Sequence, residues 1–340
     1  MIPLLIHLDI RDQFARLEWE QRKRLLQATA VMSEDGPSKW TFPPAEITLG
    51  RDRFENVQPF EYNRVKMQVP EGENDYINAS MIKLGRFNYI AAQAPMESTV
   101  THFWNMIDRY HRKDINLRIV MLTNFHEFNE QKCYTYFPED LGTIADYESR
   151  PTDTDYQRLY RIETASVTDE ARTANYTQRT LKVKKTGLIK QLEIRRDHNF
   201  REFEVEHAHF HGWQDSSVPQ GIAKDGLIAM IRALFDYPEQ ATLVVHDSAG
   251  VGRTGVYIAL DMLLCGLDNG TWSSETSGEE ADEEEDPIFA VVNNLRKQRI
   301  NMVQNEAQYA FLYEVLRVEW IRKFGKKAKS PTIAATDWSS

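Results

Sequence analysis

The order of apolar and polar residues along the chain predicts a mixture of helices and strands. Residues 9–32 carry Phe14, Leu17 and Leu25 at helical spacing among charged residues, which predicts an amphipathic helix. The pair Pro43-Pro44 ends this opening section. Short apolar runs predict strands over 88–92, 117–122 and 243–245. Further helices are predicted over 102–110, 221–236, 256–267, 287–299 and 305–323.

Residues 156–206 show a different pattern, in which apolar and polar positions alternate. The alternation recurs at 160–162, 181–183, 192–194 and 203–205, and it predicts half-exposed strands of an antiparallel meander. Helices and strands are interleaved irregularly, which favours one α/β domain of about 290 residues. We divide the chain into an N-terminal helical extension over 1–45, a domain over 46–323, and a disordered tail over 324–340.

Charge is concentrated in one part of the chain. Residues 272–286 hold eight acidic residues, so this stretch repels itself, and we expect a disordered insertion within the domain. The formal net charge is −10, and −10 + 8 leaves −2 for the rest of the chain. The overall charge argues against a general nucleic-acid-binding protein, although a local basic pocket remains compatible with it.

The chain has two cysteines, Cys133 and Cys265, too few for a disulfide framework or a four-cysteine zinc site. This count fits a reducing compartment. His7 and Asp9 interrupt the apolar start of the chain, and no basic flank precedes it, so we expect neither a signal peptide nor a membrane segment. A cytoplasmic protein is the default prediction, with the nucleus as an alternative. The sequence implies no metal and no organic cofactor.

The most informative segment spans 243–255, where a strand leads through a small-residue turn into a helix. Gly250 and Gly252 allow successive backbone N–H groups to converge at the helix N-terminus, where they form an anion-binding nest. Arg253 can add a planar guanidinium that binds a phosphoryl group with two hydrogen bonds. The residues alone therefore indicate a phosphate or sulfate site.

Three kinds of phosphate-binding loop compete for this segment. The spacing of Gly250, Gly252 and Gly255 matches a dinucleotide fingerprint, but the acidic stretch follows where a second strand with its ribose-binding acid is expected. A nucleotide P-loop requires a Lys where the chain has Arg253. The Cys-x5-Arg loop of cysteine-dependent phosphatases fits every position except Asp247, which stands in place of the Cys.

Together with other motifs, this segment resembles the active-site loop of the classical protein tyrosine phosphatases. Residues 74–80 resemble the family's Asn-Asp-Tyr-Ile-Asn-Ala-Ser motif, residues 89–95 its Gln-Gly-Pro segment, and residues 302–309 its glutamine loop. Trp213-Gln214-Asp215 resembles its mobile acid loop, and Cys133 matches a structural cysteine. The resemblance covers about residues 50 to 320 and implies a single α/β domain with a mixed, highly twisted sheet flanked by helices.

The resemblance also implies catalytic roles. In the family, a thiolate attacks phosphotyrosine, and Asp247 stands at this nucleophile position beside His246, which tunes the nucleophile. Arg253 would stabilise the transition state, and Asp215 would protonate the leaving group. Thr254 and Gln304 would assist the breakdown of the intermediate, Gln304 by placing the hydrolytic water.

Other positions match the family's substrate-binding and supporting residues. Glu127 would orient Arg253, and Trp213 belongs to the acid loop. Phe54 would stack on the substrate ring, and Asn56 stands where an Asp usually binds the substrate backbone. The expected substrate-binding set is Phe54, Asn56, Ser248, Ala249, Gly250, Val251, Gly252, Arg253 and Gln308.

Asp247 decides what activity we expect. A carboxylate is a weak nucleophile here, and its oxygens lie one bond beyond the position of the thiolate, in the volume meant for phosphate. We predict that this carboxylate fills the nest itself, held by Arg253 and by backbone amides, as an internal phosphate mimic. An acyl-phosphate mechanism would require Mg²⁺, and no second carboxylate cluster is evident for it. Gln214, in place of Pro, leaves the acid loop freer.

Three functions follow from these residues. The first is a tyrosine phosphatase homologue that is inactive or severely impaired. The second is an active phosphatase represented here as an engineered Cys-to-Asp variant. The third is a non-catalytic scaffold that acts through the acidic insertion. If the loop is open, the partner is a phosphotyrosine-containing protein or peptide; we expect a monomer that binds neither nucleic acid nor membranes.

Overall fold

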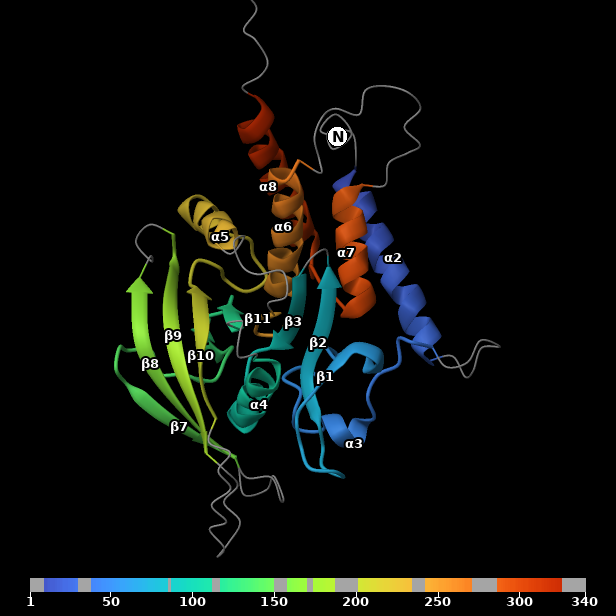
Figure 1. Ribbon diagram of the computed structural model, residues 1–340. Coiled ribbons are helices and arrows are strands. Elements are labelled where there is room, and N and C mark those ends of the chain that lie inside the picture. Colours follow the sequence, from blue (N-terminus) through green and yellow to red (C-terminus); the bar gives the residue numbers. More distant parts are fainter. Residues whose placement is uncertain are drawn as a thin grey trace, which may run out of the picture.

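The computed structural model describes residues 9–29, 38–84, 87–111, 117–149, 158–169, 174–186, 201–233, 242–270 and 286–325. Its centre is a nine-stranded mixed sheet in the order β1-β2-β3-β11-β4-β10-β9-β8-β7 (Figure 1). These strands are β1 Arg64–Lys66, β2 Tyr76–Leu84, β3 Phe87–Gln93, β4 Leu117–Met121, β7 Ile144–Glu148, β8 Leu159–Asp169, β9 Tyr176–Thr186, β10 Arg201–Phe210 and β11 Thr242–Asp247. A small hairpin is formed by β5 His126–Glu127 and β6 Glu130–Gln131.

Parallel pairing is confined to the middle of the sheet, where β3, β11, β4 and β10 lie side by side. Antiparallel pairs extend the sheet on both sides, through β2 and β1 at one edge and through β9, β8 and β7 at the other. The carboxyl ends of the parallel strands therefore meet at one edge, and in open α/β sheets this edge is the usual place for a binding site.

Helices cover both faces of the sheet. They are α2 Ile10–Thr29, α3 Ala45–Thr48, α4 Val100–Tyr110, α5 Ile222–Arg232, α6 Gly252–Asp268, α7 Pro287–Gln298 and α8 Glu306–Phe324, with short 3-10 helices at Glu61–Asn63 and Glu97–Thr99. Helix α6 follows β11 directly and packs against α7 and α8, and α2 lies along α7 (Figure 1).

Two hydrophobic clusters lie on either side of the central strand β11. Leu243 and Val245 pack into the cluster that contains α6, α7 and α8. Val244 points the other way, into the cluster that contains α4 and the buried face of β8 to β10. All three side chains are at most 1% exposed. A strand buried on both faces requires a continuous apolar run, and this is why 243–245 was readable in the sequence.

The helices and strands predicted from the sequence agree closely with those of the structure. The strands over 88–92, 117–122 and 243–245 correspond to β3, β4 and β11, and the helix over 256–267 begins four residues earlier, at Gly252. The antiparallel meander is confirmed by β8, β9 and β10. The piece at 192–194, residues 30–32, most of the acidic insertion and residues 326–340 lie outside the described residues. The sequence reading missed the long strand β2 and did not foresee that β10 joins the meander to the parallel centre.

None of the described helices combines the length and apolar character that crossing a membrane would require.

Candidate active site

The loop between β11 and α6 lies at the carboxyl edge of the parallel strands. Gly250 has φ +73°, and a Cβ at this position would lie 2.3 Å from the carbonyl oxygen of Ala92 in β3. Only glycine satisfies both conditions, because other residues disfavour positive φ and would collide with this backbone. The turn therefore packs directly on β3, and its N–H groups face the inside of the loop.

The Asp247 carboxylate occupies the inside of this loop. One oxygen, Oδ1, accepts hydrogen bonds from the N–H groups of Gly250 and Val251, the latter at 3.3 Å. The other, Oδ2, accepts from the N–H groups of Arg253 at 2.8 Å and Thr254 at 3.3 Å. The side chain is buried at the N-terminus of α6, where the helix dipole favours a negative charge. The predicted contact between Asp247 and backbone amides is thus present.

The guanidinium of Arg253 has other partners than expected. Its Nη1 donates to Glu127 Oε1 at 2.7 Å and to the carbonyl oxygen of Trp213 at 2.9 Å, and its Nη2 donates to Thr123 Oγ1 at 3.2 Å. Arg253 holds the Asp247 carboxylate through its backbone N–H and not through these guanidinium hydrogen bonds. Glu127, the residue predicted to orient Arg253, has its carboxylate buried beside the guanidinium.

The segment around Asp215 lies over the guanidinium. Asp215 Oδ1 is 3.5 Å from Arg253 Nη2, and its Oδ2 is 3.2 Å from Lys132 Nζ. The Asp215 N–H donates to Glu127 Oε2 at 2.7 Å. Gln214, which replaces the family's Pro, accepts at its carbonyl oxygen from the Ser217 hydroxyl at 2.8 Å, and this bond closes the turn.

The two predicted glutamines lie against the start of α6. A Cβ built on Gly252 would lie 3.0 Å from Gln304 Oε1 and 3.1 Å from Gln308 Nε2, so both side chains border the loop at this glycine. The Gln304 N–H donates to Gln308 Oε1 at 2.9 Å. Gln304 is exposed, whereas Gln308 is buried.

Phe54 and Asn56 are exposed residues on a segment that Arg53 anchors. Arg53 donates to the carbonyl oxygen of Pro95 at 2.8 Å and to that of Gln131 in β6 at 3.0 Å. These bonds fix the segment between the end of β3 and the hairpin that carries Glu127. Phe54, 39% exposed, can therefore offer an aromatic face at the rim of the site.

His246 is buried behind the loop and is neutral. Burial, opposed by a hydrogen bond with the Asp247 backbone, lowers the pKa of His246 to about 3. Its Nε2 lies 2.9 Å from the hydroxyl of Tyr136, which also lies 2.7 Å from Nε2 of His207. Because this imidazole is neutral, the charged groups at the loop are Asp247 and the arginines.

The sequence reading missed Arg299, which supports the loop from behind. Its guanidinium donates to the carbonyl oxygens of Gly250 at 2.8 Å and Ala249 at 3.1 Å, and to Asn78 Oδ1 at 2.7 Å. Burial lowers the pKa of Arg299 to about 10, and the nearby Tyr76 and Asp247 oppose this shift. Nothing in the local sequence distinguishes Arg299 from the other basic residues at the end of α7.

Thr123 and Lys132 were also missed. Thr123 follows β4 and donates to Glu127 Oε1 at 2.9 Å, and Lys132 faces Asp215 beside the predicted Cys133. Their positions at strand ends next to predicted site residues were the available signal. Both cysteines are buried, and neither forms a disulfide. Among the described residues, no group of three or more His, Cys, Asp and Glu side chains is arranged to hold a metal ion.

Comparison with known proteins identifies the family. The sequence model of the protein-tyrosine phosphatases matches residues 48–317, most of the chain. The chain belongs to the protein-tyrosine phosphatase family. The resemblance predicted from the motifs is confirmed at this level, and so is the single mixed-sheet domain.

Curated members of the family share about a third of the residues. Tyrosine-protein phosphatase 2 of Schizosaccharomyces pombe is 32% identical over 333 residues, which cover 94% of this chain and 40% of that protein. Tyrosine-protein phosphatase 69D of Drosophila melanogaster is 33% identical over 277 residues, which cover 78% of this chain and 16% of that protein. The chain thus spans less than half the length of these relatives.

Solved structures share the fold. The Trypanosoma cruzi protein tyrosine phosphatase TcPTP1 superimposes with a TM-score of 0.66 at 22% identity, covering 96% of this chain and 98% of that one. PTPN18 in complex with HER2 phosphopeptides gives a TM-score of 0.64 at 22% identity, covering 92% of this chain and 93% of that one. This likeness extends over the whole family domain.

Proposed function

We propose that this chain is a tyrosine phosphatase domain whose hydrolysis of phosphotyrosine is absent or severely reduced because Asp247 stands at the nucleophile position. One observation carries the proposal. The Asp247 carboxylate accepts hydrogen bonds from four backbone N–H groups of the loop. These are the donors that a bound phosphoryl group would need, so an incoming phosphate must displace a hydrogen-bonded anion.

The groups around Asp247 support the family chemistry for which the site is built. Arg253, oriented by Glu127, would stabilise charge on the phosphoryl oxygens. Asp215 lies close enough to this guanidinium to deliver a proton to a tyrosine leaving group beside it. Gln304 borders the loop at Gly252, where it would place water for hydrolysis of an intermediate. The missing part is a nucleophile, because a carboxylate attacks phosphorus weakly.

The partner that fits this site is a phosphotyrosine-containing protein or peptide, admitted when Asp247 leaves the nest. Phe54 would cover the tyrosine ring, and Arg253 would bind the phosphate. PTPN18, which shares the fold, is known in complex with HER2 phosphopeptides. We propose a monomer of the cytoplasm, with the nucleus as an alternative, that binds neither nucleic acid nor membranes. The net charge of −10 and two buried cysteines that form no disulfide support this proposal.

The decisive test is the variant Asp247→Cys assayed with p-nitrophenyl phosphate. We expect no measurable hydrolysis by the unaltered chain and clear hydrolysis by Asp247→Cys. The double variant Asp247→Cys/Arg253→Met is the control and should be silent. Turnover by the unaltered chain at a rate close to that of Asp247→Cys would contradict the proposal. Silence of a folded Asp247→Cys variant would show that Gln214, Asn56 or the acidic insertion also blocks catalysis.

Self-occupation of the loop has a separate test in the variant Asp247→Ser, which removes the internal anion. We expect it to bind a phosphotyrosine peptide at least tenfold more tightly than the unaltered chain, measured by isothermal titration calorimetry. The same peptide without phosphate is the control. Equal affinities of the two proteins for the phosphopeptide would show that Asp247 does not compete with phosphate.

A second candidate is an active phosphatase in which Asp247 is an engineered substitution for Cys. The arrangement of Arg253, Glu127 and Asp215 around the loop favours it, because this machinery has a use only beside a nucleophile. Sequencing the natural gene decides between the two, since a Cys codon at position 247 would establish the active enzyme.

A third candidate is a scaffold that acts through the acidic insertion, supported by the eight acids over 272–286. Deleting residues 273–286 should then abolish capture of the partner, whereas Arg253→Met should leave it unchanged. The opposite pattern would assign partner binding to the loop.

A further inference from the structure

The segment from Asn301 to Val303 connects α7 to Gln304 in an unusual backbone conformation. Asn301 has φ +57° and Val303 has φ +59°. Asparagine tolerates this region, but a β-branched valine adopts it only when the surroundings impose it. The Val303 N–H donates to the carbonyl oxygen of Val251 in the phosphate-binding loop at 3.1 Å. The conformation of this segment therefore sets where Gln304 lies relative to the loop.

Helix α2 supplies two of the groups that impose this conformation. Gln21, which is 6% exposed, donates from Nε2 to Asn301 Oδ1 at 2.6 Å and accepts the Asn301 N–H at 2.8 Å. Glu18 accepts from Arg296 Nη1 at 2.6 Å. Both side chains reach across from the N-terminal helix to the other end of the described chain.

Arg296 links Glu18 to the segment of residues 301–303. Its guanidinium is fully buried, and it donates to the carbonyl oxygens of Met302 at 3.0 Å and Val303 at 2.8 Å. Consecutive residues before Gln304 are thus held by α2, either directly at Asn301 or through Arg296.

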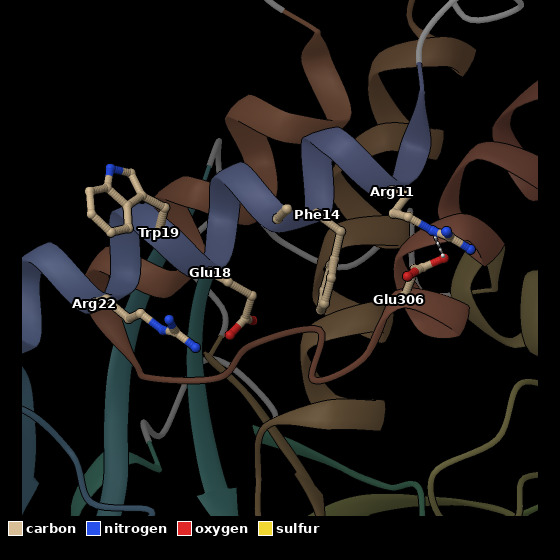
Figure 2. Close-up of a pocket in the computed structure, with 7 residues that line it drawn as sticks. Arg11, Phe14, Glu18, Trp19, Arg22 and Glu306 are labelled. Atoms are coloured by element: carbon tan, nitrogen blue, oxygen red, sulfur yellow. Dashed lines mark ion pairs between the residues drawn. The ribbon is translucent and has the colours of Figure 1, made fainter.

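Figure 2 shows how α2 lies over this region. Phe14 and Glu18 point toward the segment that leads into α8, whereas Trp19 points away from it. An ion pair between Arg11 and Glu306, 3.8 Å apart, spans from α2 to the first residue of α8. Phe14 also packs on the ring of Tyr309, with the ring centroids 5.8 Å apart, and on the Arg296 guanidinium.

We propose that Gln21 and Glu18 are positioning residues for the glutamine pair Gln304 and Gln308. They fix the backbone of residues 301–303, and this backbone delivers Gln304 to Gly252. Gln21 and Glu18 lie on α2, before residue 48, where the family match begins. Helix α2 therefore contributes to the site although it lies outside the matched residues. For its catalytic consequence, the inference rests on the proposed function.

The first test uses hydrogen–deuterium exchange on the full, otherwise unaltered chain. Gln21→Ala should raise exchange of the Asn301 and Val303 amides at least tenfold, because the Asn301 N–H loses its acceptor and the strained segment relaxes. Gln27→Ala, on an exposed position of the same helix, is the matched control and should change nothing. Unchanged exchange at 301–303, or an equal rise throughout α2 and α7, would overturn the proposal.

The second test separates the two chemical steps in the Asp247→Cys background with p-nitrophenyl phosphate. In the first step the thiolate sulfur bonds to phosphorus, and the phenolate leaves with the proton of Asp215. In the second step water displaces the thiolate and releases phosphate. We expect Gln21→Ala to slow the second step about fivefold to tenfold and to leave the initial burst of p-nitrophenol unchanged. Gln21→Glu keeps the acceptor for the Asn301 N–H but loses the donor to Asn301 Oδ1, so it should slow the second step less than Gln21→Ala does.

Each outcome of the second test leads to a different conclusion. Equal slowing of both steps by Gln21→Ala would reduce its role to stability and overturn the positioning role. An absence of p-nitrophenol release in a folded Asp247→Cys variant would show that another feature of the chain also blocks catalysis, and the exchange experiment on the unaltered chain would then decide the inference alone.

Discussion

At the scale of single residues, the site depends on which groups form hydrogen bonds with each buried charged side chain. Asp247 faces backbone amides, and Arg253 faces Glu127, so the two oppositely charged residues of the loop are satisfied by different partners. This separation matters because a substrate phosphate would need both the amides and the guanidinium. Only the amides are occupied by Asp247.

The buried pair of Arg253 and Glu127 predicts a strong effect on stability. Glu127→Gln removes the charge opposite a guanidinium that is 1% exposed. Breaking a buried ion pair costs about 3 to 5 kcal/mol. Asp215 stays 3.5 Å from the guanidinium, so the free energy of unfolding should fall by about 3 kcal/mol, at the lower end of this range. Urea denaturation followed by fluorescence measures it.

Glu130→Gln provides the control for this prediction. Glu130 lies on the same hairpin, but its side chain is 71% exposed, so the change should cost less than about 0.5 kcal/mol. Equal losses in the two variants would show that the charge of Glu127 is not what stabilises Arg253.

Sequence reasoning recovered those residues that a local pattern marks. Gly250, Gly252 and Arg253 were readable because the chemistry of an anion nest requires them close together in sequence. Arg299 and Gln21 were not readable, because each reaches the site across a long sequence distance and looks like an ordinary polar residue of a helix. Their importance arises from burial, and the sequence alone does not show burial of one Arg among several.

At the scale of elements, the phosphate-binding loop is held by the strand in front of it and by the end of α7 behind it. The close approach of Gly250 to β3 and the two carbonyl bonds of Arg299 leave the loop little freedom. The anion nest is therefore preformed, and the Asp247 carboxylate fits into it.

Gly250→Ala should reveal this constraint. The added methyl group meets backbone atoms of Ala92 and also opposes the positive φ, so we expect a loss of about 3 kcal/mol in the free energy of unfolding. Gly270→Ala is matched to it, since Gly270 has φ +77° but open space around its Cβ position. It should lose only about 1 kcal/mol. Urea titrations of both variants measure the difference, and similar losses would argue against close packing on β3.

The strands were predicted well where burial follows a regular pattern along the chain. Strands β3, β4 and β11 are buried on both faces and were visible as apolar runs, and β8 to β10 were visible as alternation. β2 was missed because its role appeared in the sequence only as a motif, and its residues are mixed in polarity although most are buried. The parallel pairing of β10 with β4 depends on tertiary packing that no local pattern encodes.

At the scale of the whole molecule, buried histidines link stability to pH. Burial lowers the pKa of His102 and His246 to about 3 and holds the pKa of His207 and His209 well below the ordinary value. These four residues stay neutral in the native state, whereas in the unfolded state each takes up a proton near its ordinary pKa of about 6.5. Stability is therefore fully present above about pH 6.5 and is lost as the pH falls below it.

The free energy of unfolding should decrease by up to about 1.4 kcal/mol per pH unit for each of these histidines. Urea denaturation at several pH values between about 6.5 and 5, above the range where most carboxylates titrate, measures this slope. His102→Gln removes one of these histidines and should reduce the slope by up to about 1.4 kcal/mol per pH unit. A slope unaffected by His102→Gln would contradict neutral burial of this residue.

The packing of α2 also decides how the domain can be produced as a recombinant fragment. A fragment that starts at residue 48, where the family match begins, lacks Glu18 and leaves the Arg296 guanidinium without its carboxylate partner. It also uncovers the ring of Phe289, on which Arg16 lies, and the ring of Tyr309, which Phe14 covers. We expect such a fragment to aggregate, so a recombinant protein made for crystallisation should begin before Ile10.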